Sequence, residues 1–382
     1  MKIIKRFLKL HLRGKNIRKP IDFRELLHRE KVELDVLGIS QYIGNKIVLV
    51  TGGGGSIGSE LCRQIANFKP KKLLILDIYE NSSYELQIEL EKKFPYLDFE
   101  IIIASITDLE RVENIFKFFT PEVVFHAAAF KHVPLMEDNP TEAVKNNIFG
   151  TLNLIKCADK FSTKKFVLIS TDKAVNPTSV MGATKRVCEI LIQTYDSVSD
   201  TEFVAVRFGN VLGSNGSVIP IFKRQIEEGG PVTITHSDIT RYFMLIDEAV
   251  QLVLQAGAFA KGGEIFILDM GDPIKIYDLA CDLIRLLGLV PEKDIHIEVI
   301  GLRPGEKLYE ELLMKEEGLK ETSHEKIFVS KPEQWNIEDI KDKLMELKKH
   351  IEWGHEERLL IKLKELVPNY TLSNHTNSSK IL

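Results

Sequence analysis

Two charged side chains of opposite sign stand side by side where a buried strand is predicted to end. The apolar run from Phe166 to Ile169 has the length of a buried parallel strand, and Thr171, Asp172 and Lys173 follow it. Because parallel sheets bind ligands at the carboxyl ends of their strands, Asp172 and Lys173 could act there as an acid and a base on one substrate. The alternative is a loop in which the carboxylate and the amine form only a salt bridge.

A glycine-rich segment between a strand and a helix could hold a phosphate. Residues 47–50 form an apolar run of strand length, and apolar residues recur at helical spacing from Leu61 onward. A strand that leads through glycines into a helix brings backbone N–H groups and the positive helix end to a pyrophosphate, which side chains would obstruct. The sequence therefore predicts dinucleotide binding by Gly52, Gly55, Ser56, Ile57 and Gly58.

A carboxylate after the second predicted strand indicates which dinucleotide the chain would bind. Asp77 ends the buried run 73–76, about 20 residues after the glycines, as the dinucleotide-binding fingerprint requires. A carboxylate there hydrogen-bonds the ribose hydroxyls of NAD and repels the extra phosphate of NADP, so we expect NAD. The alternative is a solvated aspartate at a strand end. Asp108, after the next strand, could hydrogen-bond the adenine, and the small Ala127 and Ala128 would let the cofactor approach the backbone.

Strand-like and helix-like segments alternate along the chain. Further apolar runs of strand length lie at 99–104, 122–125, 203–207 and 265–268. The intervening segments are long enough for crossover helices, so the predicted fold class is α/β, a doubly wound parallel Rossmann sheet with a smaller C-terminal substrate-binding region. The predicted parts are a basic amphipathic N-terminal extension (1–45), an NAD-binding Rossmann domain (46–210), a substrate-binding region (211–330) of which 236–270 returns to the Rossmann domain, and C-terminal helices with a polar tail (331–382).

Composition narrows the kind of protein further. The chain has 382 residues, 44% of them hydrophobic, and a net charge of −4, which gives no reason to expect a nucleic-acid partner. Its four cysteines are far apart and form no C-x-x-C pair, so we expect neither a metal site nor disulfides, in a cytoplasmic protein. The sequence contains no run of about 18 apolar residues that would span a membrane.

The first 20 residues are strongly basic, with no acidic residue before Asp22, and their apolar side chains can share one face of a helix. Such a helix can lie on an anionic membrane surface, dock on a partner or dock on the protein's own body. Peripheral contact of residues 1–20 with the inner face of a membrane is therefore one expectation. A homo-oligomer is another.

Longer motifs resemble a known family. The segments T-G-G-G-G-S-I-G, H-A-A-A and S-T-D-K, with Lys185 four residues after Met181, resemble the extended short-chain dehydrogenase/reductases. More narrowly, the chain is similar, over roughly residues 25 to 330, to the capsular-polysaccharide-biosynthesis (CapD-like) nucleotide-sugar 4,6-dehydratases. The segments that carry this similarity are F-H-A-A-A-F-K-H-V-P-L-M-E, S-T-D-K-A-V-N-P-T-S, M-G-A-T-K-R, R-F-G-N-V-L-G-S-N-G-S-V-I-P and L-R-P-G-E-K-L-Y-E-E-L.

The resemblance implies an NAD-dependent enzyme of surface polysaccharide or glycan biosynthesis. Its substrate would be UDP-N-acetylglucosamine, oxidised at C4, deprotonated at C5 with loss of the C6 hydroxyl as water, and reduced at C6. In this scheme Lys173 is the base for C5, Asp172 the acid for the C6 hydroxyl, Thr171 a partner of the C4 hydroxyl, and Lys185 holds the nicotinamide ribose. The implied substrate-binding residues, with the arginines on the diphosphate, are Lys131, His132, Asn210, Arg241, Arg303 and Glu306.

Met181 departs from the superfamily, which has a catalytic tyrosine at this position. A thioether cannot act as an acid or a base, but the replacement is familiar in the CapD-like subgroup. A base role for Lys173 requires a neutral amine, and we expect burial and the positive charges of Lys185 and NAD to lower its pKa from the usual value of about 10.4.

Two other functions remain open from the sequence. A UDP-sugar 4-epimerase would use the same fold and cofactor without a base for C5. A non-catalytic NAD-binding regulator would tolerate Met181 but would not need Asp172 and Lys173 together.

Overall fold

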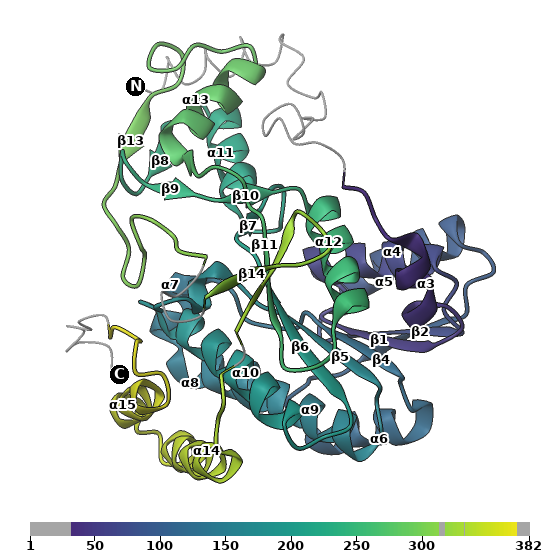
Figure 1. Ribbon diagram of the computed structural model, residues 1–382. Coiled ribbons are helices and arrows are strands. Elements are labelled where there is room, and N and C mark those ends of the chain that lie inside the picture. Colours follow the sequence, from purple (N-terminus) through teal and green to yellow (C-terminus); the bar gives the residue numbers. More distant parts are fainter. Residues whose placement is uncertain (1–31, 313–317, 332, 373–382) are drawn as a thin grey trace.

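The computed structural model describes residues 32–312, 318–331 and 333–372 (Figure 1). Within these residues the main element is a nine-stranded sheet in the order β14-β15-β11-β6-β5-β4-β1-β2-β3. Its parallel strands are β1 (Ile47–Thr51), β2 (Lys72–Asp77), β3 (Phe99–Ile103), β4 (Val123–His126), β5 (Lys165–Ile169), β6 (Glu202–Arg207) and β11 (Ile265–Leu268).

The strand order confirms the predicted doubly wound Rossmann sheet. Successive strands run outward from β1 to β3, and the chain then returns to place β4 on the other side of β1. In such sheets the reversal opens a crevice at the carboxyl ends of the two central strands, where ligands bind. The glycine loop follows β1 and the small residues Ala127 and Ala128 follow β4, so both sit at this crevice.

Both faces of the sheet are covered by helices, which is why its strands are apolar without alternation. Along β1, Val48 and Val50 pack in the core of one face, while Leu49 packs in the core of the other. The first face carries α3 (Val36–Ile43), α4 (Ser56–Asn67), α5 (Glu80–Lys93) and α12 (Ile246–Phe259). The second carries α6 (Leu109–Phe119), α9 (Thr151–Lys160), α10 (Val180–Asp196), α14 (Ile337–Glu352) and α15 (Glu356–Leu366). Shorter helical elements on the way are α7 (Val133–Asp138), α8 (Pro140–Ala143), a π-helix (Val144–Gly150) and a 3-10 turn (Asp172–Ala174).

A smaller lobe with its own apolar core lies above the main sheet in Figure 1. It contains α11 (Val218–Glu227), α13 (Ile276–Leu286) and the parallel pair of β8 (Val232–Ile234) with β13 (Ile297–Val299). Two short pairs join this region to the main body, β7 (Asn210–Val211) with β10 (Phe243–Met244) and β9 (Thr240–Arg241) with β12 (Ile274–Lys275). The lobe falls within residues 211–330, the range predicted to bind substrate.

The structure differs from the predicted boundaries at three places. Strands β14 (Leu319–Glu321) and β15 (Ile327–Ser330) extend the main sheet, because β15 pairs antiparallel with β11. Helix α3 lies within the predicted N-terminal extension (1–45) but belongs to the packed body, since it buries Ile39 and Ile43 against the core shared with α12. After α15, Tyr370 is fully buried, so the packed chain continues into the region predicted to be a polar tail. The predicted basic helix at 1–20 lies outside the described residues.

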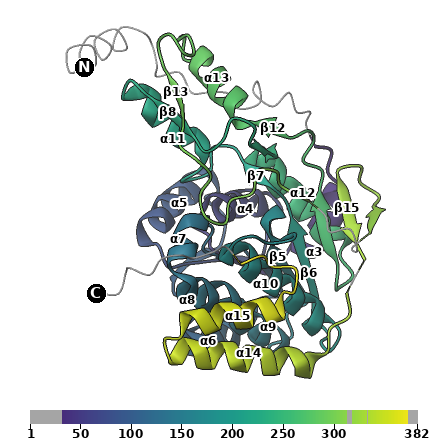
Figure 2. The same ribbon diagram turned by 90° about the vertical axis from the view of Figure 1, so that its left-hand side faces the viewer.

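The C-terminal helices form a layer of their own. Figure 2 shows α14 and α15 side by side; both contact α10, and α15 also contacts α8. Beyond α15 the backbone N–H of Thr371 donates to the carbonyl of Pro177 at 2.8 Å, which ties the chain end to the loop before α10. No helix in the described part of the chain is long and apolar enough to cross a bilayer.

Candidate active site

The loop from β1 to α4 is closed so tightly that it requires glycine at two positions. Gly52 has a φ of +72°, and a Cβ there would lie 2.6 Å from the backbone nitrogen of Ala128. A Cβ on Gly58 would lie 2.0 Å from the carbonyl oxygen of Gly52. The loop ends at Gly55, the N-cap of α4, which has no side chain to occupy the free N–H groups of the first helical turn. These N–H groups can therefore serve an anion.

Asp77 borders the same loop. Its two carboxylate oxygens accept backbone hydrogen bonds, one from Gly54 N and one from Tyr79 N, each at 2.8 Å. An ionised carboxylate has room for further donors, so ribose hydroxyls can still bind it. Asp108 differs, because its exposed side chain caps α6 by accepting from Arg111 N at 3.0 Å. The structure therefore gives Asp108 a structural role in addition to the predicted contact with adenine.

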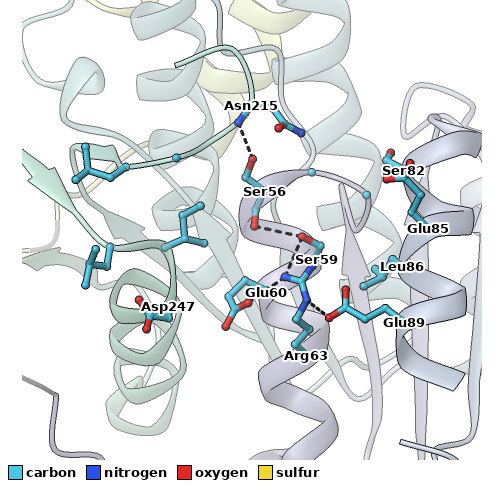
Figure 3. A pocket seen from close by; sticks show the side chains of 16 residues that line it. Ser56, Ser59, Glu60, Arg63, Ser82, Glu85, Leu86, Glu89, Asn215 and Asp247 are labelled. Atoms are coloured by element: carbon cyan, nitrogen blue, oxygen red, sulfur yellow. Dashed lines mark hydrogen bonds and ion pairs between the residues drawn. The ribbon is translucent and has the colours of Figure 1, made fainter. Parts of the chain in front are cut away.

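A cleft of about 590 Å³ opens beside the glycine loop (Figure 3). Gly54, Gly55 and Ser56 line it together with residues of α5 and α12. The loop that follows β7 reaches across, and its Asn215 N donates to Ser56 Oγ at 3.0 Å. Further along α4, Arg63 pairs with Glu60 of the same helix and with Glu89 of α5. The contact from Asn215 was not predicted from the sequence. It links the segment that leads into the smaller lobe to the start of α4, just after the glycine loop.

The predicted acid and base form one hydrogen-bonded cluster at the carboxyl end of β5. Thr171 Oγ1 donates to Asp172 Oδ1 at 2.8 Å, and Lys173 Nζ lies 3.0 Å from the same oxygen. Lys173 Nζ also donates to Asn210 Oδ1 at 3.2 Å and lies 3.5 Å from Glu310 Oε1. The Asp172 side chain is fully buried, whereas that of Lys173 is 23% exposed. The lysine is thus the member of the pair that a ligand can reach.

The electrostatic surroundings of Lys173 contradict the expected fall of its pKa. Burial alone lowers the pKa of this amine, but the carboxylates of Asp172 and Glu310 raise it by more, so the pKa lies above its usual value. Arg241 opposes them weakly. The prediction was wrong because it considered the cations near Lys173 and not the second carboxylate, which arrives from a distant part of the chain.

Lys185 and Met181 lie on the first turns of α10. Lys185 Nζ donates to the carbonyl of Ile169 at 2.7 Å, and burial lowers the pKa of its amine. It therefore sits at the end of β5 beside the acid–base cluster, as its predicted cofactor contact requires. Met181 is buried, and the helix begins with Ser179 Oγ accepting from Gly182 N at 3.1 Å.

A second, smaller cavity of about 120 Å³ is lined by three of the six predicted substrate-binding residues. Its lining includes Lys173, Arg241, Arg303, Glu306 and Glu310. Arg241 Nε lies 3.2 Å from Glu310 Oε1, and its Nη2 lies 3.4 Å from Glu306 Oε1. Arg303 is exposed, and its backbone N–H donates to Glu306 Oε2 at 3.1 Å. Lys173 and the two arginines thus face one space.

The other three predicted substrate-binding residues do not line this cavity. Lys131 and His132 are exposed just before α7, with the His132 ring against Gly216, where a Cβ would lie 2.6 Å from His132 Cε1. Asn210, by contrast, belongs to the cluster around Lys173, and its Nδ2 donates to the Tyr242 carbonyl at 3.1 Å. The predicted roles of Lys131, His132 and Asn210 in binding substrate stay predictions.

Sequence reasoning missed two charged groups at the site. Glu310 lies in the segment L-R-P-G-E-K-L-Y-E-E-L, but nothing in its spacing indicated that it would meet Lys173. Glu189 of α10 accepts from Ser170 Oγ at 2.6 Å and pairs with Arg207 Nη2 at 2.7 Å, directly behind the acid–base cluster. The opposite charges on α10 and β6 are visible in the sequence, but their burial is not.

Sequence comparisons place this architecture among known proteins. The chain is 56% identical over 315 residues to the capsular polysaccharide biosynthesis protein CapD of Staphylococcus aureus, covering 82% of this chain and 52% of the relative. It is 36% identical to a UDP-N-acetylglucosamine 4,6-dehydratase (inverting) of Campylobacter jejuni (71% and 78%) and 35% identical to a UDP-glucose 4-epimerase of Rickettsia bellii (72% and 79%). The chain thus spans about half the length of CapD.

Two solved structures resemble the fold. Pen from Bacillus thuringiensis superposes with a TM-score of 0.70 at 38% identity, over 76% of this chain and 89% of that one. DesIV, a dTDP-glucose 4,6-dehydratase from Streptomyces venezuelae with NAD bound, superposes with a TM-score of 0.63 at 20% identity, over 81% and 97%. At that identity the second likeness concerns the fold alone.

The match to a family of known proteins covers most of the chain. Residues 48–332, which include the glycine loop, the acid–base cluster and the smaller lobe, match the family described as polysaccharide biosynthesis protein. This extent, with the identity to CapD, confirms the resemblance drawn from the motifs. The chain belongs to this family of polysaccharide biosynthesis proteins.

Proposed function

We propose that the chain is an NAD-dependent nucleotide-sugar 4,6-dehydratase whose substrate is UDP-N-acetylglucosamine. The observation that carries this proposal is the convergence of Asp172, Lys173, Arg241 and Arg303. Lys173, which is paired with the buried Asp172, opens onto a cavity that two arginines also line. Dehydration of a sugar needs the acid and the base on one edge of the ring, and a nucleoside diphosphate needs the cations.

The residues present fit a bound NAD. The glycine loop leaves the first turn of α4 free for a pyrophosphate, and the Asp77 carboxylate at its side suits a ribose with both hydroxyls. Lys185, held at the end of β5, would bind the nicotinamide ribose. When bound, NAD supplies the hydride acceptor that oxidises C4 and later reduces C6. The solved dehydratase with NAD bound has the same fold and supports this assignment.

The acid and the base can be prepared by one internal proton transfer. Lys173 Nζ is 3.0 Å from Asp172 Oδ1, so its extra proton can pass to the carboxylate. That transfer leaves a neutral amine to take the C5 proton. It also leaves a protonated carboxyl, which could protonate the departing C6 hydroxyl once substrate binding has opened the buried Asp172 side chain to the sugar. Thr171, bonded to the same oxygen of Asp172, would hydrogen-bond the C4 hydroxyl. Because the carboxylates hold the proton on Lys173 in the resting site, this transfer must follow binding of the substrate.

The diphosphate would bind at the two arginines, which differ in availability. Arg303 is exposed at the cavity, whereas Arg241 is held by Glu306 and Glu310. A phosphate oxygen would therefore meet Arg303 first and would contact Arg241 only by displacing a carboxylate. Bidentate pairing with phosphate is a property of arginine that lysine lacks, so Arg303→Lys should raise the KM for the UDP-sugar.

Turnover of UDP-N-acetylglucosamine tests the proposal. Mass spectrometry should find a product lighter than the substrate by one water, and in heavy water the product should carry deuterium at C5. A product of unchanged mass would instead support a 4-epimerase, the alternative that the Rickettsia relative favours. Absence of turnover on any UDP-sugar tried, with NAD bound, would overturn the proposal in favour of a non-catalytic protein. Lys341→Ala, which changes an exposed cation of α14, is the control and should leave turnover unchanged.

A further inference from the structure

Glu310 is a buried carboxylate between two cations. It comes from the loop that returns from the smaller lobe, and its side chain is 3% exposed. Oε1 lies 3.5 Å from Lys173 Nζ and 3.2 Å from Arg241 Nε. Oε2 is buried and has no hydrogen-bond partner among the described residues. Buried carboxylate oxygens normally have hydrogen-bond partners, so an unpartnered oxygen here suggests that Glu310 has a role other than packing.

The same feature recurs on the other side of Lys173. Asp172 Oδ2 is also buried and also lacks a hydrogen-bond partner within the described chain. A Cβ at position 209 would lie 3.2 Å from this oxygen, so the absence of a side chain at Gly209 leaves space beside it. The amine of Lys173 thus lies within 3.5 Å of oxygens of two carboxylates, each with one further oxygen unused.

We propose that Glu310 is a positioning residue that holds the Lys173 amine at the cavity and stabilises its protonated form until substrate binds. This inference rests on the proposed function, in which Lys173 is the base for C5. Glu310 does not need to touch the sugar for this. It acts through Lys173, so the loop that returns from the smaller lobe takes part in the control of the base.

The charges around Lys173 determine the direction of the effect. Asp172 on its own turn and Glu310 from the returning loop favour the ammonium form, Arg241 of β9 opposes it, and Asn210 of β7 is neutral. An opposite charge at this range typically raises the pKa of a lysine by about one to three units. Removing the charge of Glu310 takes away one favourable partner and also leaves Arg241 to repel Lys173. Both changes make the neutral amine available at lower pH.

The test is competitive labelling of Lys173 in the NAD-loaded protein without substrate. An amine-reactive anhydride is applied across a pH series, and peptide mass spectrometry reports the midpoint at which Lys173 becomes reactive. In Glu310→Gln, which keeps the shape of the side chain, the midpoint should fall by about one to three pH units. The matched control is Glu311→Gln, an exposed neighbour that pairs with Lys307 at 3.0 Å, in which the midpoint should not move. An unchanged or higher midpoint in Glu310→Gln would overturn the proposal.

A second measurement ties the effect to catalysis. The acidic limb of the kcat/KM profile for the UDP-sugar, which reports groups of the free enzyme, should move in Glu310→Gln by the same amount and in the same direction as the labelling midpoint. If Glu310→Gln does not fold, Glu310→Asp replaces it: drawing the charge back by one methylene should lower the labelling midpoint by a smaller amount, and an unchanged midpoint there would again overturn the proposal. If the wild type proves not to dehydrate UDP-sugars, the labelling still decides whether Glu310 controls Lys173, so the two failures are distinguishable.

Discussion

The buried ion-pair cluster around Glu189, next to the acid–base cluster, has a contribution to the free energy of unfolding that can be worked out from the structure. Its carboxylate is fully buried on α10, with Arg207 Nη2 at 2.7 Å, Arg186 Nη1 at 3.1 Å and the Ser170 hydroxyl at 2.6 Å. Ser170 immediately precedes the acid–base cluster. Replacing Glu189 with Gln keeps the size of the side chain and removes its charge, so the variant isolates the electrostatic contribution.

The magnitude follows from the pKa of Glu189. Burial raises this pKa, but Arg207 and Arg186 lower it by more, to about 2. Relative to about 4.3 in an unfolded chain, the ionised carboxylate contributes about 3 kcal/mol to the free energy of unfolding. Since the folded pKa is the lower one, this contribution is complete above about pH 5 and is lost as the pH falls toward 2. Glu189→Gln at pH 7 also leaves two buried guanidinium groups without this charge, for a total loss of about 3–5 kcal/mol.

Urea unfolding of the wild type and of Glu189→Gln at several pH values between 7 and 3 measures this loss. The gap in the free energy of unfolding should be widest at pH 7 and should narrow below about pH 5. Glu142→Gln is the control, because its exposed pair with Lys145 should contribute no more than about 1 kcal/mol. A gap at pH 7 below about 1 kcal/mol, or one that does not narrow in acid, would refute the electrostatic account of this cluster.

Three further variants test other parts of the structure. Lys173→Ala should lower the formation of dehydrated product by about 10²–10⁴-fold, and a loss under tenfold by mass spectrometry would assign the C5 proton to another residue. Gly58→Ala places a Cβ 2.0 Å from the Gly52 oxygen, so calorimetry should find NAD binding weakened at least about tenfold. An unchanged affinity would contradict the proposed binding of NAD by the glycine loop. Tyr370→Ala should lower the free energy of unfolding by about 3–5 kcal/mol, against little change for the exposed Trp353→Ala.

The sheet could be predicted from the sequence because its signals are local. Strands buried on both faces appear as short apolar runs, and the observed bounds of β1, β2 and β5 differ from the predicted runs by about one residue. The glycine loop and Asp77 were found for the same reason, since the strand, the turn and the helix that form this part of the site are consecutive in the chain. Asp172 and Lys173 are adjacent in sequence and therefore adjacent in space.

What could not be predicted depends on contacts between distant segments. Glu310 meets Lys173 across 137 positions of the chain, and only the path of the loop returning from the smaller lobe brings them together. Tyr370 was assigned to a polar tail because its neighbours are polar, yet its ring is buried against the core formed with α14 and α15. In both cases the local composition is ordinary, and the tertiary path of the chain decides the role.

The raised pKa of Lys173 creates a conflict that the geometry can resolve. The carboxylates that hold the amine in place also hold its proton, whereas a base must release that proton. Exchange with solvent would make the neutral amine rare at neutral pH. Transfer to Asp172, 3.0 Å away, needs no solvent, but the bound sugar must drive it, because in the resting site the attraction between the charges outweighs the cost of burying them. The transferred proton is then on the carboxyl that the C6 hydroxyl requires. We therefore interpret the ion pair as the resting form of the catalytic pair, in which binding of the sugar, and not the bulk pH alone, triggers formation of the base.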